Sequence, residues 1–374
     1  MGPSPRRPAR LVRGELPKEI VIETIAPETI ERFPWAGHLG TKLVPYVVER
    51  LREAKTTLLF TNTRSQAELW FRALEEAMPE WEGLIAPHHG SLDRGLRREY
   101  EQALRDGALR CVVCTSSLDL GVDFSPVDQV IQVGSPKGIA RLLQRAGRSG
   151  HQPGAVSRIT GVPTHAFELI EFAAARDALS AMEIESREPL ELSLDVLCQH
   201  LVTVALGGGF EPDSMLEEVR RTHAFQRLSD EQWNWCVDFV SRGGPALKSY
   251  PQFARAIERH GKYVVEDRHI SRFHRMSVGT ITSDAAVLLK YASGKKLGTV
   301  EESFVTRLKP GDRFMFSGRV LELLRFKDMA AIVKRAKGKP STVPQWMGGR
   351  MPLSSQLARG VRVKLEEARE GRLE

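Results

Sequence analysis

The chain has 374 residues and a mass of 41.8 kDa. Because this is longer than a chain that usually folds around a single hydrophobic core, we expect two or three domains. Its 41% hydrophobic and 27% charged residues are typical of a folded globular protein and exclude a disordered one. No apolar run approaches the ~20 residues that cross a bilayer, so we expect no membrane partner.

Charge and cysteine content narrow the class further. Lys and Arg outnumber Asp and Glu by 54 to 47, and the resulting net charge of +7 permits a polyanionic partner without identifying one. The basic, proline-rich start of the chain, 1–18, lacks the apolar stretch of a secretory signal and is interpreted as a tail. Four cysteines are too few for a disulfide framework, so we expect a reducing, cytoplasmic environment.

Short β-rich runs alternate with helical stretches through 19–188, which is typical of a parallel, doubly wound α/β sheet. The predicted strands are 57–60, 83–86, 111–114 and 129–133, and the predicted helices are 66–78 and 92–105. Ligands of such sheets bind at loops beyond the carboxyl ends of the strands. Cys111 and Cys114 have zinc-like spacing, but they lie within a predicted buried strand without a second Cys/His pair nearby, so we expect a core role and no metal.

The remaining sequence predicts two smaller domains and a final helix. Segment 189–275 contains three short helices and a hairpin, with a capping box at Ser229 and Gln232, and is interpreted as winged-helix-like. Segment 276–350 is rich in predicted antiparallel strands with Gly- and Pro-containing turns, so we expect a small β-barrel-like domain or curled sheet. Segment 351–374 is interpreted as a charged, truncated helical segment.

The segment that follows the predicted strand 111–114 carries residues suited to phosphate. Small hydroxyl residues directly after a buried strand, Thr115 and Ser116, can direct hydroxyl and backbone N–H groups at phosphate oxygens. Gly121 allows close approach of a ligand to the backbone, and Asp123 can accept a hydrogen bond from a ribose hydroxyl. We therefore expect a nucleotide or nucleic-acid contact here.

A second segment, 144–151, carries two arginines three residues apart on a helical turn. Arg145 and Arg148 should share roughly one face and suit the charge that develops on a transferring γ-phosphate. Ordinary loops with solvated arginines explain either segment alone equally well. The two segments in this order and spacing favour phosphate chemistry.

These residues resemble the second RecA-like domain of superfamily 2 helicases. The resemblance assigns 61–65 to motif IV, 89–91 to the backbone-contacting motif that follows it, 115–123 to motif V and 144–150 to motif VI. The sequence is also similar to the large helicase-related (Lhr) family, with its bacterial, ligase-associated DEXH-box branch as the best match. The segments that support this are 32–38, 163–166 and 343–355.

The resemblance implies an ATP-dependent DNA helicase that moves 3′ to 5′ along one strand and acts in DNA repair, in a bacterial, nucleoid-associated setting. It makes Arg148 the γ-phosphate-sensing finger, with Arg145 and Gln144 coupling it to DNA and nucleotide, and gives Gly121 and Asp123 to nucleotide binding. The residues that it assigns to nucleic acid are Thr63, Arg64, Gly90, Ser91, Thr115, Ser116, Trp346 and Arg350.

Trp346 lies in a loop rich in Gly and Lys. An exposed indole among cations is a base-stacking platform. The alternative is a tryptophan packed on the β-rich domain, and the resemblance favours base stacking.

The sequence contains no Gly-x-x-x-x-Gly-Lys-Ser/Thr phosphate loop and no Asp-Glu-x-His/Asp box for magnesium. In the family these belong to the first RecA-like domain, which we expect to precede Met1 and to hold most of the ATP and Mg²⁺. The chain alone is therefore predicted not to hydrolyse ATP. The implied partners are single-stranded DNA and duplex junctions, the first RecA-like domain, and a ligase or nuclease of the same pathway.

Two alternatives stay open at this point. One is a non-catalytic nucleic-acid clamp that keeps a RecA-like scaffold, although a clamp has no need of Arg148 or Asp123. The other is part of an RNA helicase, because phosphate contacts do not encode the sugar.

Overall fold

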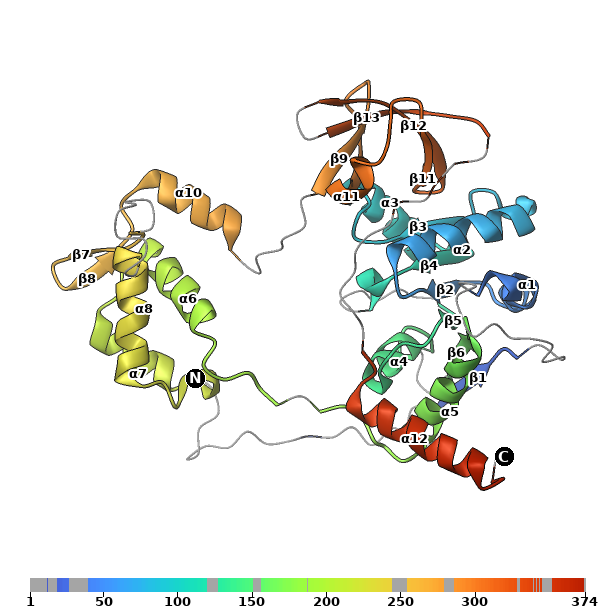
Figure 1. Ribbon diagram of the computed structural model, residues 1–374, viewed down its shortest axis with the longest axis horizontal. Coiled ribbons are helices and arrows are strands. Elements are labelled where there is room, and N and C mark those ends of the chain that lie inside the picture. The colour runs from blue at the N-terminus through green and yellow to red at the C-terminus, as the bar shows by residue number, and fades with distance from the viewer. Residues whose placement is uncertain are drawn as a thin grey trace. The chain divides into compact units, whose positions relative to one another are not determined.

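The computed structural model describes residues 12, 19–26, 40–119, 127–150, 156–186, 188–243, 254–278, 286–327, 330–338, 340, 342, 344 and 352–372 (Figure 1). The chain divides into two compact units. The first comprises 1–185 and 284–374, and the second comprises 186–283.

A six-stranded, entirely parallel sheet with strand order β1-β6-β5-β2-β4-β3 organises the first unit. The strands are β1 (Ile20–Thr24), β2 (Thr57–Phe60), β3 (Ile85–His88), β4 (Cys111–Cys114), β5 (Gln129–Val133) and β6 (Ser157–Val162). The predicted doubly wound sheet is confirmed, with β3 two residues later than expected. All residues of β2, β3 and β4 are buried, as expected for parallel strands covered on both faces.

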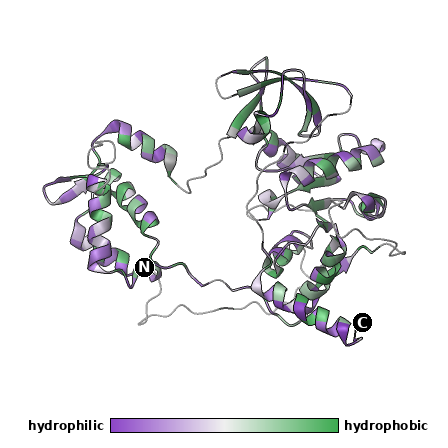
Figure 2. Ribbon diagram, viewed as in Figure 1, coloured by the Kyte–Doolittle hydropathy of each residue, from purple (hydrophilic) through white to green (hydrophobic). Residues whose placement is uncertain are grey.

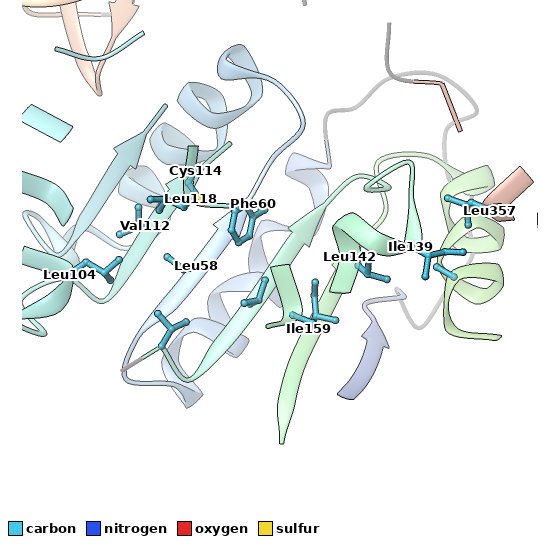
Figure 3. Packing of buried hydrophobic residues seen from close by; sticks show 14 of the residues in the cluster. Leu58, Phe60, Leu104, Val112, Cys114, Leu118, Ile139, Leu142, Ile159 and Leu357 are labelled. Atoms are coloured by element: carbon cyan, nitrogen blue, oxygen red, sulfur yellow. The ribbon is translucent and has the colours of Figure 1, made fainter. Parts of the chain in front are cut away.

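Helices cover both faces of this sheet. They are η1 (Thr41–Leu43), α1 (Val44–Glu53), α2 (Arg64–Ala77), η2 (Pro79–Trp81), α3 (Arg94–Arg105), η3 (Ser116–Leu118), α4 (Ile139–Ala146) and α5 (Ala166–Ser180). Alternate residues of the strands enter opposite cores: Leu58 and Phe60 face α4 and α5, whereas Leu59 faces α1 and α2. Figure 3 shows the first of these cores, in which Leu58, Phe60 and Ile159 lie over the strands.

The last helix, α12 (Ser355–Arg369), belongs to the same core. Its Leu357 and Val361 are buried in the cluster that also holds Ala174 of α5, and Leu357 is labelled in Figure 3. At Gly360 a β-carbon would lie 3.2 Å from the Ala174 methyl group, so the small residue lets the two helices approach closely. The charged terminal segment is thus a structural layer of the sheet domain.

A second, five-stranded sheet has the order β10-β9-β13-β12-β11. Its elements are β9 (Ala286–Tyr291), β10 (Lys296–Glu301), α11 (Glu302–Val305), β11 (Arg313–Phe316), β12 (Arg319–Lys327) and β13 (Ala330–Arg335). Register shifts in β10 and β12 mark bulges, which bend and twist a sheet. The curled sheet is confirmed, but β13 pairs with β9 in parallel, so its antiparallel character is not complete.

A buried glutamate joins the two sheets of the first unit. Glu68 of α2 is fully buried, and its Oε1 accepts hydrogen bonds from the backbone N–H of Ser317 at 2.6 Å and from His89 Nε2 at 2.9 Å. Its Oε2 accepts from the N–H of Gly318 at 3.1 Å. Ser317 and Gly318 have φ of 52° and 68°, so the β11–β12 turn presents both N–H groups to the same carboxylate.

The second unit consists of helices and one hairpin. Its elements are α6 (Leu194–Leu206), α7 (Pro212–Arg220), η4 (His223–Phe225), α8 (Asp230–Arg242), β7 (Ile257–Arg259), β8 (Lys262–Val264) and α10 (Arg268–Ser277). The predicted capping box is confirmed: Ser229 Oγ accepts from the N–H of Gln232, and the Gln232 side chain accepts from the N–H of Ser229. Figure 2 shows that α6 carries many hydrophobic residues, consistent with its buried core face.

No described helix combines the length and apolar composition that a membrane crossing needs.

We expect Glu68→Ala to lower the free energy of unfolding by about 3 kcal/mol, because it leaves buried donors without their acceptor. Urea denaturation of the purified chain measures this. Glu99→Ala, at an exposed carboxylate of α3, is the control and should change stability by less than about 0.5 kcal/mol. Equal effects of the two variants would contradict the anchoring role of Glu68.

Candidate nucleotide and nucleic-acid site

Polar loops meet at the carboxyl ends of β2, β3 and β4, as parallel neighbours require. The N–H of Thr61 after β2 donates to the carbonyl of Cys114 at 2.8 Å, and the N–H of Thr115 after β4 donates to the carbonyl of His88 at 3.2 Å. These backbone bonds fix the three loops against one another. The sequence motifs expected to contact phosphate therefore lie along one edge of the sheet.

The loop after β2 ends in a capped helix. Thr63 is extended and its hydroxyl accepts from the N–H of Gln66 at 3.1 Å, so α2 begins at Arg64. Both Thr63 and Arg64 are exposed. The N-terminus of a helix favours anions, because its first N–H groups point outward with the positive end of the helix dipole. This arrangement suits a phosphate contact.

The loop after β3 separates its two predicted contact residues. Gly90 is exposed, and among described residues no heavy atom lies within 4 Å of the position of a β-carbon there. Ser91 is buried; its Oγ accepts from Arg64 Nη1 at 2.9 Å and its carbonyl accepts from the N–H of Thr299 in β10 at 2.8 Å. Gly90 and Arg64 therefore face solvent, whereas Ser91 supports them and binds the second sheet.

The loop after β4 shows a similar division. Thr115 is buried at the start of η3, and Ser116 is exposed. Ser117, for which the sequence pattern predicts no role, lies with its Oγ 2.8 Å from His88 Nδ1 and links this loop to β3. The other predicted nucleotide and nucleic-acid residues, Gly121, Asp123, Trp346 and Arg350, lie outside the described residues.

Arg145 lies inside the protein, with 1% of its surface exposed. Its Nε and Nη2 donate to the two carboxylate oxygens of Asp119 at 2.9 and 3.3 Å, and its Nη1 donates to Gln132 Oε1 at 2.5 Å. The guanidinium carbon lies 4.7 Å from the centre of the Phe60 ring. A planar, bidentate arginine suits this geometry, which lysine cannot reproduce.

This burial changes the interpretation of Arg145. The sequence predicted that it would share one face with Arg148, but its guanidinium is enclosed by protein groups, whereas Arg148 is partly exposed. Arg145 ties α4 to the loop after β4 through Asp119, and its role in coupling Arg148 to DNA and nucleotide stays a prediction. Asp119 and Gln132 were missed, although a glutamine inside the apolar strand β5 is a signal of a buried polar partner.

Arg148 and Gln144 reach the surface at the end of α4. Gln144 is exposed and Arg148 is partly exposed, with its Nε donating to the carbonyl of Gln144 at 3.3 Å. The N–H of Arg148 donates to the carbonyl of Arg145 at 2.9 Å, so the fixed arginine and the surface arginine occupy one continuous turn. Arg148 is therefore positioned by a rigid neighbour.

The described residues fit one wall of an ATP site. Arg148 offers cationic donors suited to a γ-phosphate, but no group of three or more His, Cys, Asp or Glu suited to a metal occurs in the described parts of the chain. Cys111 is buried in β4, and burial raises the pKa of its thiol to about 12, as expected for a core residue.

The sheet domain and the second unit match known families. Residues 41–152 match the helicase conserved C-terminal domain, and residues 177–343 match the winged helix domain of the large helicase-related protein. The helicase match contains the loops after β2, β3 and β4 and the arginine-bearing helix α4. The fold and these matches thus define a RecA-like helicase C-terminal domain with a winged-helix domain.

Individual relatives agree with this class. ATP-dependent helicase Lhr-Core protein 2 of Thermococcus barophilus is 32% identical over 94% of this chain and 41% of its own length. ATP-dependent helicase Lhr-Core of Sulfolobus acidocaldarius is 33% identical over 83% of this chain and 36% of its own length. The structure of Mycobacterium smegmatis helicase Lhr bound to ssDNA and AMP-PNP has a TM-score of 0.60 and 29% identity over 71% of this chain and 34% of that one.

The chain belongs to the large helicase-related (Lhr) family and matches the carboxyl-terminal part of an Lhr helicase. It spans about two fifths of the length of these curated relatives. The predicted resemblance to the Lhr family is confirmed, and its ligase-associated branch stays a prediction.

Replacing Arg145 or Arg148 by alanine should change the free energy of unfolding by different amounts. We expect Arg145→Ala to lower the free energy of unfolding by about 3–5 kcal/mol, because Asp119 stays buried without its cation. Arg148→Ala should change it by less than about 0.5 kcal/mol, because Arg148 is partly exposed. Chemical denaturation of both variants measures the difference, and similar losses would contradict the assigned positions.

Proposed function

We propose that this chain provides the second motor domain and the accessory DNA-binding domains of an ATP-dependent helicase that translocates 3′ to 5′ on DNA. The sheet-edge loops with Thr63, Arg64, Gly90 and Ser116 hold the phosphates of the tracked strand. Arg148 contacts the γ-phosphate. The name "ATP-dependent helicase" of the Lhr-Core relatives supports this proposal, as does the ssDNA in the mycobacterial structure.

One observation carries the proposal: the buried bidentate pair between Arg145 and Asp119. Asp119 follows η3 in the loop that begins at Thr115, and Arg145 is one turn before Arg148. A movement of Arg148 on loss of the γ-phosphate is therefore transmitted to a loop that holds nucleic acid. A helicase needs this coupling, whereas a static clamp does not.

ATP with Mg²⁺ supplies the phosphoryl group whose transfer to water releases the free energy for movement. In this chain Arg148 stabilises the charge on that group, Asp123 accepts a hydrogen bond from the ribose, and Gly121 lets the nucleotide approach the protein backbone closely. We infer that the phosphate loop and the magnesium-binding carboxylates belong to a first RecA-like domain. The chain without that domain is then inactive as an ATPase.

We infer a role in DNA repair from the similarity of segments 32–38, 163–166 and 343–355 to the ligase-associated branch. This includes a ligase or nuclease partner and a cytoplasmic, nucleoid-associated setting in a bacterium. The resemblance alone supports these finer points, and the named Lhr-Core relatives are from archaea. Co-purification of a ligase or nuclease with the full protein tests them.

We expect the purified chain to show no ATPase activity, and the chain joined to a first RecA-like domain of the family to show activity stimulated by single-stranded DNA. Arg148→Ala should lower kcat of the joined protein by about 10³-fold, because the transition-state charge loses its cation. Arg158→Ala, at an exposed arginine of β6, is the matched control and should keep full activity.

ATPase activity of the chain alone that Arg148→Ala abolishes would overturn the inactive-half prediction. Strand displacement on duplexes with 3′ or 5′ single-stranded tails gives the polarity, and RNA tails in the same assay distinguish the RNA-helicase alternative.

Trp346→Ala in the joined protein should weaken binding of single-stranded DNA by about 1–3 kcal/mol, because one base loses its stacking partner. Fluorescence anisotropy with a labelled oligonucleotide measures the affinity, and thermal unfolding should show no change. Trp235→Ala is the control, because Trp235 is an exposed tryptophan on α8 of the second unit. Unchanged DNA affinity of Trp346→Ala would contradict base stacking.

A further inference from the structure

The amino end of the arginine-bearing helix α4 is held by a distant carboxylate. Gly138 is its N-cap residue and provides no side chain to cap it. Instead, Glu185 Oε1 accepts from the N–H of Ile139 and Glu185 Oε2 accepts from the N–H of Ala140, each at 2.6 Å. One carboxylate thus satisfies two of the free N–H groups at the start of the helix.

Gly138 leaves room for this contact. A β-carbon there would lie 3.1 Å from Glu185 Oε1 and 3.9 Å from the β-carbon of Ser354. Ser354 also donates its N–H to the carbonyl of Lys137 at 2.9 Å and caps α12 with its hydroxyl. The start of α4 is therefore the place where the loop after α5 and the start of α12 meet.

The charge of Glu185 suits its position. Partial burial raises the pKa of this carboxyl, but hydrogen bonds from Ser354 and from the backbone of Ala140 and Ile139 outweigh it and lower the pKa below its usual value. An ionised carboxylate interacts favourably with the positive end of the helix dipole.

Glu185 lies where the chain leaves the first unit for the second. After α5 the backbone turns, with the N–H of Glu183 donating to the carbonyl of Ala178 at 2.8 Å. Glu185 is the last residue of this part of the first unit, and the second unit begins at Ser186. The chain that leaves the sheet domain for the winged-helix domain therefore passes over the start of α4.

We propose that Glu185 is a positioning residue for Arg148: its carboxylate fixes the first turn of α4 at the exit of the chain toward the winged-helix domain. The inference rests on the proposed function, in which the orientation of Arg148 determines how it contacts the γ-phosphate. Helix α4 has only eight residues, and so short a helix depends on contacts at its ends. Arg145 fixes its carboxyl end, and Glu185 fixes its amino end.

Hydrogen–deuterium exchange of the chain tests the contact without nucleotide. We expect Glu185→Ala to raise the exchange rates of the Ile139 and Ala140 amides by about tenfold or more, because both lose their acceptor. Glu183→Ala, at an exposed glutamate two residues earlier, should leave these rates unchanged. Unchanged protection in Glu185→Ala would overturn the proposal.

ATPase assays of the chain joined to a first RecA-like domain test the catalytic role. We expect Glu185→Ala to lower kcat by about 3- to 10-fold, with unchanged KM for ATP and unchanged DNA affinity, and Glu185→Gln to lie between it and the parent protein. Glu183→Ala should match the parent. Glu185→Gln also keeps the test valid if the alanine variant fails to fold.

Arg148→Ala, assayed in parallel, separates two kinds of failure. If it is inactive while both Glu185 variants keep full kcat, the positioning role is refuted and the proposed function stands. If Arg148→Ala keeps full kcat, the proposed function is refuted, and the positioning role with it.

Discussion

The buried pair between Arg145 and Asp119 is the interaction on which the site depends. Enclosing a guanidinium and a carboxylate costs several kcal/mol of hydration, and the pair persists because each polar group has a partner of suitable geometry. Gln132 and the Phe60 ring complete the enclosure. The pair fixes the arginine-bearing helix to the loop after β4, and Glu185 fixes the other end of that helix. Arg148 therefore lies in the turn directly after a short helix that is held at both ends.

The elements with strong local signals were predictable. Strand 111–114 is a short apolar run, and the capping box at Ser229 follows from spacing alone. The parallel pairing of β13 with β9 was not predictable, because about forty residues separate the strands and no local pattern encodes a non-local pairing. A sheet assembled from sequential hairpins is the default expectation, and this pairing departs from it.

The candidate site also has features that were predictable from the sequence and features that were not. The resemblance to helicase motifs located Thr63, Arg64 and Gly90, and residue type located Ser116, in loops that the structure brings to one sheet edge. They could not show that Arg145 and Ser91 are buried, because both burials depend on packing between elements distant in sequence. Ser91 is covered by the second sheet, whose attachment depends on Glu68, a charged residue that sequence patterns assign to solvent.

The packing of α12 on α5 has a further consequence. The second unit is inserted in the first along the chain, because the first comprises 1–185 and 284–374 and the second comprises 186–283. A module attached through two chain connections has less conformational freedom than one attached through a single connection. The packing of α12 on α5 keeps the residues after the inserted unit in the core of the sheet domain, so that domain is built from two separate stretches of the chain.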